Sequence, residues 1–460
     1  MHLGEGYAMM VRGSSWKRGL AALCAGAVML ATGACSSMGG DEDLVTAPPP
    51  VQEEALPTLP PPDIPTSAEA VEKNRVALLL PVSGSNARVG RSLANAASMA
   101  LDDLGEVGIE LEVYDTAGGA ERAAERAIAD GAGLFLGPLL AENVSEIRSI
   151  ARGRNIPVIS FSNDAEIAGS GVYIMGFQPN QSIERVVGYA RSQGMGNFAA
   201  LVPQGVYGRR ASQAFLAAVR DAGGRVTAIE TYERKRSALT AAVRRLTDFD
   251  ARSARAASRG VVRSDGTVRN VEENMPPVSF DALLIADGGA IASEFLQSLG
   301  RFDAGPDEVK YLGTELWNAD PRIAQAQGLH GSLFASVPDA RFRQLAQRFK
   351  TRYGGQPSRL ASLAYDATLL AAGIARDWPL DRTFPVDRLT DPDGFVGIDG
   401  IFRFGANGIA QRGMEVQQVA PGGSRTVSPA PSSFQNRRVS MLVPEDLPGG
   451  PGGRVLAYLN

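Results

Sequence analysis

The chain of 460 residues is poor in cysteine and histidine, with two of each. Cys24 and His2 lie in a leader segment that we expect to be removed, so the mature chain would keep only Cys35 and His330. This scarcity excludes histidine–cysteine metal clusters and nucleophilic systems that need a histidine base. A formal net charge of −4 gives no basic footprint for nucleic acid. We therefore expect no catalytic residues, no metal, no other cofactor and no nucleic-acid partner.

The first 34 residues contain the three parts of an export signal. Lys17 and Arg18 precede an apolar run at 19–31, and small residues follow it. Cys35 comes directly after the small residues, which resembles the lipobox of bacterial lipoproteins, where the cysteine becomes the lipidated first residue of the mature chain. The resemblance implies a signal peptide at residues 1–34, lipidation of Cys35 and contact with a membrane through the lipid.

The residues beside Cys35 refine this interpretation. The lipobox usually has leucine three positions before the cysteine, and this chain has Thr32 there. The alternative is an ordinary secreted protein that is cut near Ala34. Ser36 follows the cysteine, and in Gram-negative lipoproteins this resembles an outer-membrane signal, because aspartate there is the usual inner-membrane signal. We expect a protein of the periplasm that is anchored by lipid to the outer membrane.

Two segments lack the apolar periodicity of a folded domain. Between residues 41 and 67 the chain contains eight prolines, which favour extended polyproline geometry and leave little surface to bury. We interpret residues 35–73 as a disordered, lipidated, Pro-rich tether. Residues 421–460 are rich in Gly, Pro and Ser and are interpreted as a mobile C-terminal tail, in which 439–443 can pair as a short strand.

Between these segments, short apolar runs alternate with longer helical patterns. Val76–Leu80 is a continuous apolar run, and the segment 91–104 carries an apolar stripe at helical spacing. The same alternation begins again near Val172, and it is the signature of parallel sheets with helices on both faces. We predict an α/β fold with two Rossmann-like, doubly wound lobes. The polar run Glu233–Arg236 is interpreted as a solvated helix start.

The loops that follow the predicted strands share a composition rich in serine and glycine. In open α/β sheets, ligands bind beyond the carboxyl ends of the strands, where helix N-termini and backbone amides converge. For any single loop, turn formation explains the same residues equally well. The recurrence of such loops predicts a cleft, whose candidate ligand-binding residues are Ser83, Gly84, Arg88, Gly137, Ser160, Ser162, Tyr207 and Glu315.

Several runs of residues occur in the order typical of the type I periplasmic-binding-protein superfamily. The runs are Val76–Ala97, Tyr114–Gly118, Leu136–Leu139, Val158–Asn163 and Tyr207–Gly208. The chain resembles this superfamily over residues 74–420. The resemblance implies a periplasmic binding protein type I fold, in which three crossing segments join the two lobes, so we expect lobe one at about 74–177 and 316–393 and lobe two at about 178–315 and 394–420.

Three further runs resemble a narrower group, the lipoproteins called penicillin-binding protein activators. They are Gly313–Trp317, Ala364–Ala367 and Gly394–Phe404. This resemblance implies a binding protein without enzymatic activity that activates a peptidoglycan synthase by protein contact. The expected partner is a bifunctional penicillin-binding protein.

The superfamily also contains leucine and branched-chain amino-acid receptors of ABC importers. These receptors hold the carboxylate of the ligand with hydroxyls and amides and its ammonium with an acid, and this chain keeps Tyr207 and Glu315 of that pattern. A packing aromatic and an acid at a helix N-terminus explain the same two residues. The chain departs from the receptor pattern at Val89, Ala141, Glu142, Asp164, Ala290 and Ile291.

These departures decide the order of the two expected functions. Acids at Glu142 and Asp164 would repel the carboxylate of an amino acid at close range. We therefore expect the activator function first. The alternative is a substrate-binding lipoprotein of an ABC importer, with an amino acid of the leucine or branched-chain type as its small-molecule ligand.

Overall fold

The computed structural model describes residues 72–258, 275–318, 320–434 and 440–441. The predicted signal peptide, Cys35, nearly all of the predicted tether and the end of the predicted tail lie outside these residues. Within the described ranges, no helix combines the length and the apolar content that a membrane span requires.

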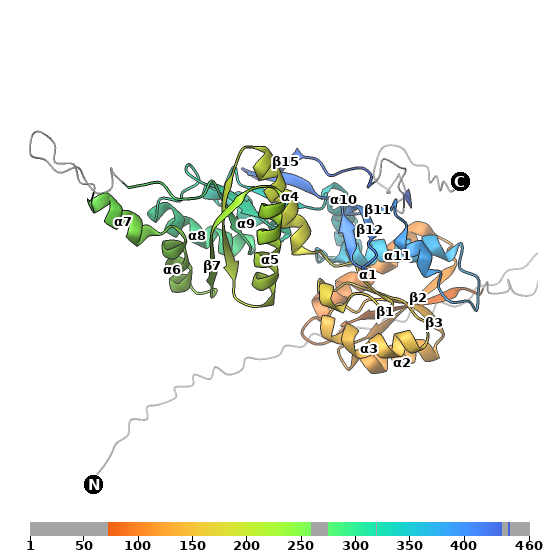
Figure 1. Cartoon of the computed structure of the whole chain (residues 1–460). Coiled ribbons are helices and arrows are strands. Elements are labelled where there is room, and N and C mark those ends of the chain that lie inside the picture. The colour runs from red at the N-terminus through yellow and green to blue at the C-terminus, as the bar shows by residue number, and fades with distance from the viewer. Residues whose placement is uncertain (1–71, 259–274, 319, 435–439, 442–460) are drawn as a thin grey trace, which may run out of the picture. The chain divides into compact units, whose positions relative to one another are not determined.

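The first lobe is built on a parallel sheet of five strands with helices on both faces (Figure 1). The strand order is β2-β1-β3-β4-β5. The strands are β1 (Asn74–Leu80), β2 (Ile109–Asp115), β3 (Ala132–Leu136), β4 (Val158–Ser160) and β5 (Val172–Ile174), and the helices are α1 (Ala87–Leu104), α2 (Ala120–Ala129), α3 (Ala141–Gly153), the 3-10 turn η1 (Ala165–Ile167), α10 (Ala340–Tyr353), α11 (Ala361–Ala375) and the 3-10 turn η5 (Val386–Thr390).

The alternation of side chains along β1 explains why both faces are covered. Val76, Leu78 and Leu80 belong to the core cluster that contains residues of α1 and α11, whereas Ala77 and Leu79 belong to the cluster that contains residues of α2 and α3. Successive side chains of a strand point to opposite faces of a sheet. A strand buried on both faces therefore reads as the continuous apolar run that the sequence contains.

The second lobe is built on a sheet of seven strands in the order β15-β14-β10-β9-β8-β6-β7. Strands β6 to β10 are parallel, and β14 and β15 extend the sheet in antiparallel fashion. The strands are β6 (Asn197–Pro203), β7 (Arg225–Tyr232), β8 (Ala282–Ile285), β9 (Lys310–Gly313), β10 (Leu333–Ser336), β14 (Glu415–Ala420) and β15 (Gly423–Ser428).

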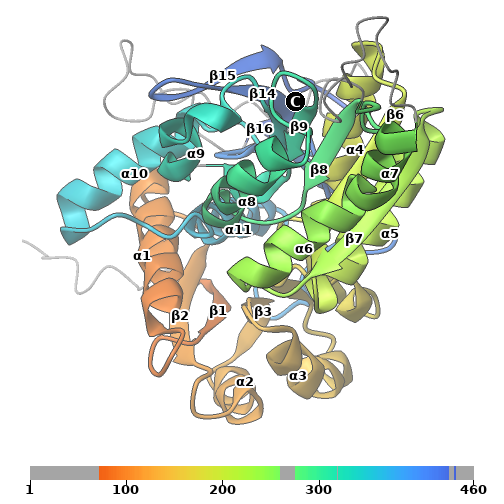
Figure 2. The same cartoon turned by 90° about the vertical axis from the view of Figure 1, so that its left-hand side faces the viewer.

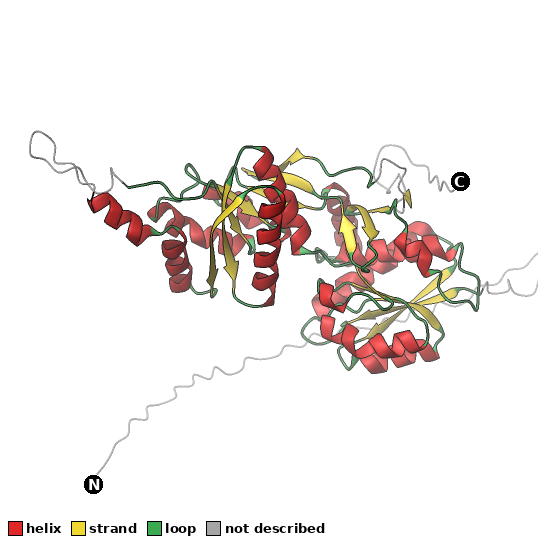
Figure 3. Cartoon of the chain, viewed as in Figure 1, coloured by secondary structure: helices red, strands yellow, loops and turns green. Residues whose placement is uncertain are grey.

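Helices cover both faces of this second sheet as well, as Figure 3 shows. One core cluster contains residues of α4 and α5, and another contains residues of α6, α8 and α9. The helices are α4 (Pro179–Ser192), α5 (Val206–Asp221), α6 (Arg236–Leu246), α7 (Phe249–Ser258), α8 (Gly289–Arg301) and α9 (Pro321–Gln325), with 3-10 turns η3 (Glu315–Trp317) and η4 (Gln327–Leu329). The predicted α/β fold with two doubly wound lobes is confirmed.

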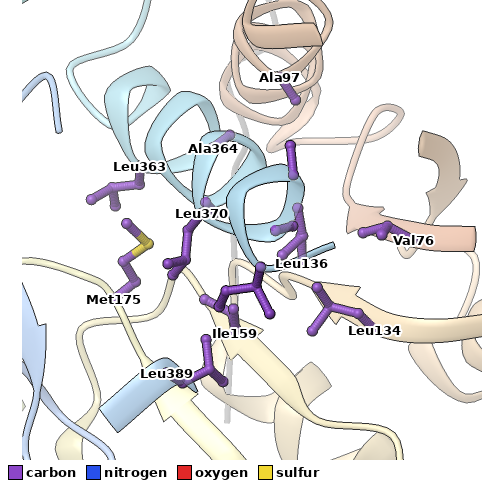
Figure 4. Packing of buried hydrophobic residues seen from close by; sticks show 14 of the residues in the cluster. Val76, Ala97, Leu134, Leu136, Ile159, Met175, Leu363, Ala364, Leu370 and Leu389 are labelled. Atoms are coloured by element: carbon purple, nitrogen blue, oxygen red, sulfur yellow. The ribbon is translucent and has the colours of Figure 1, made fainter. Parts of the chain in front are cut away.

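A small sheet of four strands lies against the core of the first lobe. Its order is β13-β12-β11-β16, with β11 (Phe395–Gly397), β12 (Gly400–Phe404), β13 (Ala410–Arg412) and β16 (Ser440–Met441). Phe395, Phe402 and Phe404 join the same core cluster as α11. Nearly every residue of α11 is buried, and Figure 4 shows Leu363, Ala364 and Leu370 of this helix packed over the strand residues Leu136 and Ile159. A helix that is apolar all round belongs in the interior.

The strand pairing differs from the lobe boundaries that the sequence predicts. β10 pairs with β9 in the second sheet, so the chain returns to the first lobe after Ser336 and not near residue 316. The segment 394–412 lies in the small sheet against the first lobe, and the chain returns to the second lobe with β14. β15 also pairs within the predicted tail. The sequence pattern predicts that a strand forms but carries no signal for which sheet it joins.

Candidate functional site

Ser83 lies in the loop that connects β1 to α1, and its hydroxyl is used inside the first lobe. Ser83 Oγ donates to Asp115 Oδ2 at 2.5 Å, and the backbone N–H groups of Val82 and Ala117 donate to Asp115 Oδ1 at 3.0 Å each. These hydrogen bonds hold the pKa of Asp115 below its ordinary value, although partial burial opposes them. Asp115 therefore ties together the loops that follow β1 and β2.

Three other first-lobe candidates have different surroundings. Gly84 is exposed and has a φ of 70°, and Arg88 is exposed in the first turn of α1. Gly137 is buried with a φ of 96°, and a Cβ atom there would lie 2.2 Å from the carbonyl oxygen of Leu79. Gly137 is therefore required by the close approach of two backbone segments.

Ser160 and Ser162 are both buried and hold the loop after β4. Ser160 Oγ donates to the carbonyl oxygen of Pro138 at 2.9 Å and accepts from the backbone N–H of Ser162 at 3.1 Å. Ser162 Oγ accepts from the backbone N–H of Asp164 at 3.1 Å. The Ser160 hydroxyl therefore links this loop to the loop after β3, and the Ser162 hydroxyl satisfies a backbone group of its own loop, as turn-forming serines do.

Tyr207 and Glu315 meet in the second lobe. The Tyr207 hydroxyl lies 3.2 Å from Glu315 Oε1 and 3.1 Å from Thr314 Oγ1, and the Ser182 hydroxyl of α4 donates to Glu315 Oε2. Burial raises the pKa of the Glu315 carboxyl, and the hydrogen bonds from Ser182 and Tyr207 oppose that rise. Burial, together with the charge of Glu315, also raises the pKa of the Tyr207 hydroxyl. Both oxygens of Glu315 therefore have hydroxyl partners from the chain itself.

A second charged cluster at the strand ends of this lobe was missed by the sequence analysis. The buried carboxylate of Asp287, after β8, accepts from Arg234 Nε at 2.8 Å and from the Tyr232 hydroxyl at 2.9 Å. Residues 233–236 are exposed and α6 begins at Arg236, as the sequence predicts, and Arg234 in addition pairs with Asp287. The signal available in the sequence was that Arg234 and Asp287 both follow strands, β7 and β8.

One ion pair joins the two lobes directly. Arg210 of α5 lies 2.6 Å from Asp164, the N-cap residue of η1, and 3.6 Å from Glu166. The side chains of Arg210 and Asp164 are both mostly buried. Asp164 is thus neutralised from within the chain, which corrects the expectation that its charge faces a ligand uncompensated.

The motifs at 364–367 and 394–404 contribute to a buried group of charges outside the predicted cleft. Arg359 donates to Asp399 at 2.8 Å, and the Arg412 guanidinium lies 5.3 Å from the ring centre of Phe402. Burial, with the nearby charge of Asp399, raises the pKa of Asp366 to about 7. These residues come from α11, the small sheet and the segment before α11, so the group joins α11 to the small sheet.

A surface pocket of about 1070 Å³ lies elsewhere. α4 and α5 contribute Glu184, Gly188, Gln213 and Ala214, and η1 and the small sheet contribute further residues. None of the eight candidate residues lines this pocket. Within the described part of the chain, no group of three or more His, Cys, Asp or Glu residues is arranged to hold a metal ion.

The comparison with known protein families decides the class of the chain. The model of a family described as periplasmic binding protein matches residues 73–424. The chain belongs to this family. Membership gives a binding-protein fold and an extracytoplasmic location. The match spans both lobes and all eight candidate cleft residues.

Solved structures of the periplasmic binding protein family have the same fold. A putative branched-chain amino acid ABC transporter protein from Rhodospirillum rubrum is 20% identical with a TM-score of 0.62, and covers 77% of this chain and 100% of its own. The LpoA C-domain from Haemophilus influenzae, a regulator of PBP1A, is 19% identical with a TM-score of 0.56 and the same coverage. The leucine binding protein LivK from Thermotoga maritima is 19% identical with a TM-score of 0.51, over 77% of this chain and 98% of its own.

An uncharacterized protein from Rickettsia prowazekii is 28% identical over 177 residues. The alignment spans 38% of this chain and 47% of the Rickettsia protein, which is about half the length of that relative. The resemblance to the type I periplasmic-binding-protein superfamily is confirmed, and the solved structures of the same fold include both a leucine binding protein and a regulator of PBP1A.

Proposed function

We propose that this protein is a lipid-anchored extracytoplasmic binding protein that activates a penicillin-binding protein, a bifunctional peptidoglycan synthase, by protein contact. The observation that carries the proposal is the engagement of Glu315. An amino-acid receptor needs an acid for the ammonium of its ligand, and here each carboxylate oxygen of Glu315 already accepts a hydrogen bond from the chain, from Ser182 and from Tyr207. A ligand ammonium would have to share the carboxylate with these two hydroxyls.

A second observation supports the same conclusion. Arg210 of the second lobe contacts Asp164 of the first lobe directly, at 2.6 Å. In a receptor, the free energy of ligand binding drives the shift between open and closed lobes. An ion pair within the chain that already joins the lobes leaves less of the free energy of lobe closure for a ligand to supply. Such a protein acts on its partner by contact through its surface.

The experiment for this proposal is a purified glycan polymerisation and crosslinking assay. The full mature chain carrying Cys35→Ser, purified without lipid, is added to the bifunctional penicillin-binding protein of the same organism in detergent. We expect a several-fold increase in the rate of crosslinked product. The absence of binding and of stimulation for every bifunctional synthase of the organism would rule the activator function out.

The proposed anchor has its own test in cells. Acylation of Cys35 should place the protein in the membrane fraction, because each buried methylene of an acyl chain contributes about 0.8 kcal/mol. We expect Cys35→Ser to move the protein to the soluble periplasmic fraction, while Ser36→Ala leaves it in the outer-membrane fraction. Equal membrane attachment of the Cys35→Ser protein would contradict the anchor.

The amino-acid receptor is the second candidate function, because Tyr207 and Glu315 do lie side by side. Calorimetric titration of the same mature chain with leucine, isoleucine and valine distinguishes the two. We expect no heat of binding. A micromolar dissociation constant that Glu315→Ala abolishes would place the receptor function first.

A further inference from the structure

The outer side of α5 combines features that are usual for a protein contact. We define the α5 face as Val206, Arg209, Gln213, Leu216 and Arg220. We propose that the α5 face is the surface on which the partner docks, and that its occupant is an acidic amphipathic helix of the partner protein. This inference rests on the proposed function and names the surface and the kind of segment that it recognises.

The residues of the α5 face lie on one side of the helix. They are three or four positions apart, which is the spacing that aligns side chains along a helix. All five are exposed, while Ala211, Phe215, Ala218 and Val219 on the opposite side pack into the core. The exposed face of a surface helix is ordinarily polar. Two large aliphatic residues on this face therefore call for an explanation.

The two aliphatic residues are well exposed. Val206 is 53% exposed and Leu216 is 49% exposed, and both belong to the small set of large apolar side chains that the described residues leave open to solvent. Ten residues separate them, so they stand about 15 Å apart along the helix at 1.5 Å per residue. Two apolar anchors at this separation match about three turns of a partner helix laid along α5.

Hollows flank the α5 face on both sides. The pocket of about 1070 Å³ lies on the side of α4, which packs against α5, and its floor includes the small residues Gly188 and Ala214. A second hollow of about 560 Å³ lies toward β7, the edge strand of the sheet, and Leu216, Gly224 and Val226 contribute to its lining. Gln213 lines both hollows. Figure 2 shows α4, α5 and β7 on one side of the second lobe.

The charge of the α5 face indicates which kind of partner segment it attracts. The α5 face carries two arginines, Arg209 and Arg220, and no acid, whereas the whole chain carries a formal charge of −4. Arg210 is paired with Asp164, and Arg220 lies 2.8 Å from Asp221. Arg209 and Arg225 are exposed. A basic helix face on an acidic protein attracts an acidic segment and suppresses basic ones.

A binding experiment with surface variants tests the α5 face. The probe is the bifunctional penicillin-binding protein of the same organism, solubilised in detergent, and the ligand is the full mature chain carrying Cys35→Ser. We expect Leu216→Glu to weaken binding at least tenfold and the double variant Arg209→Glu with Arg220→Glu to do the same. Val113→Glu on β2 of the first lobe is the matched control, because Val113 is 44% exposed, and we expect a change of less than twofold.

Leu216 is the chosen apolar position because it lies away from the candidate residue Tyr207, which follows Val206 directly. Thermal unfolding midpoints within a degree or two of the parent chain establish that the variants fold. If the parent chain binds and Leu216→Glu binds equally well, the α5 face is excluded and the proposed function stands. If the parent chain binds no synthase, the proposed function itself fails.

A photo-crosslinking residue in place of Gln213 identifies the occupant. We expect crosslinks to an acidic helical segment of the synthase, located by mass spectrometry of the crosslinked peptides. The same residue at Val113 serves as control and should give none. Crosslinks to an extended segment added to the β7 edge, to lipid alone or to a second copy of this chain would each overturn the proposed occupant.

Discussion

The loops at the strand ends of the two lobes contrast in what their polar side chains do. In the first lobe, Ser83 bonds to Asp115 after β2, Ser160 bonds to the carbonyl oxygen of Pro138 after β3, and Ser162 bonds to the backbone of its own loop. In the second lobe, acids meet side chains from distant segments: Glu315 meets Tyr207, and Asp287 meets Arg234. Serine hydroxyls at the strand ends of the first lobe therefore hold loops in place, whereas acids at the strand ends of the second lobe bind side chains from other segments.

This contrast concerns stability as well as function. A serine that satisfies a loop contributes about the value of a neutral hydrogen bond. A buried acid with a cation partner contributes little when intact, yet removing one partner leaves the other uncompensated. We therefore expect single substitutions to act more strongly in the second lobe than in the first.

The largest expected effect comes from Asp287→Ala. This change leaves the Tyr232 hydroxyl and the Arg234 guanidinium without their acceptor, and we expect a loss of about 2–3 kcal/mol in the free energy of unfolding. The half-exposed Arg234 keeps the loss below that of a fully buried pair. Urea unfolding measures it. Asp221→Ala removes an exposed pair with Arg220 and should leave the free energy of unfolding unchanged within the error of the measurement; equal losses in the two variants would contradict the comparison.

A smaller loss is expected for Ser160→Ala in the first lobe. The variant leaves the N–H of Ser162 without its acceptor in a buried loop, whereas the carbonyl oxygen of Pro138 keeps the N–H of Phe161, and we expect a loss of about 1–2 kcal/mol. Ser83→Ala is the control, because Ser83 is exposed and water can replace its bond to Asp115. Urea unfolding of both variants should place Ser83→Ala within a few tenths of the parent, and the reverse order would show that burial does not govern these loops.

The contrast between the lobes also marks how far the sequence could be interpreted. The positions of Ser160, Tyr207 and Glu315 after strands follow from the alternation of apolar runs and helical stripes, because parallel strands end at one edge of the sheet. The pairs Arg210–Asp164 and Arg234–Asp287 join residues 46 and 53 positions apart, and periodicity carries no information on such contacts. Their partners depend on the packing of α5 and on the order of β7 and β8 in the sheet.

The assignment of strands to lobes failed for a related reason. β10 is a short apolar strand like those of the first lobe, and only its pairing with β9 and β14 places it in the second sheet. The small sheet lies against α11 through three phenylalanines, which a sequence pattern shows as apolar but does not place. Local pattern predicts the element, and the tertiary core decides its neighbours.

Breaking the ion pair between the lobes should have a modest effect on stability and a visible effect on local opening. Arg210→Ala removes the partner of Asp164, and we expect a loss of about 1 kcal/mol because water still reaches both side chains. Amide hydrogen exchange in η1, residues 165–167, should become faster. Arg209→Ala changes the neighbouring exposed arginine and is the control for charge; faster exchange in both variants would exclude a specific role of Arg210.

The smallest and sharpest effect is a difference in sign between two acids. Hydrogen bonds hold the pKa of Asp115 in the first lobe below its ordinary 3.8, so its contribution to stability is present above that value and is lost as the pH falls. Burial holds the pKa of Glu315 in the second lobe above its ordinary 4.5, so the folded chain loses stability as the pH rises from 4.5 through the raised value. Asp115→Asn and Glu315→Gln remove these two titrations.

Free energies of unfolding measured from about pH 3 to about pH 7.5 compare each variant with the parent chain. We expect the free energy of unfolding of Asp115→Asn to decrease relative to that of the parent as the pH rises through 3.8, because only the parent is stabilised by the ionised acid. We expect the free energy of unfolding of Glu315→Gln to increase relative to that of the parent as the pH rises above 4.5, because only the parent must ionise a buried acid. The titration of the buried Asp366 is common to all three proteins and cancels in the differences. If both differences in free energy of unfolding changed in the same direction with pH, the pKa values of Asp115 and Glu315 would be shifted in the same direction, and the contrast between the lobes would be wrong.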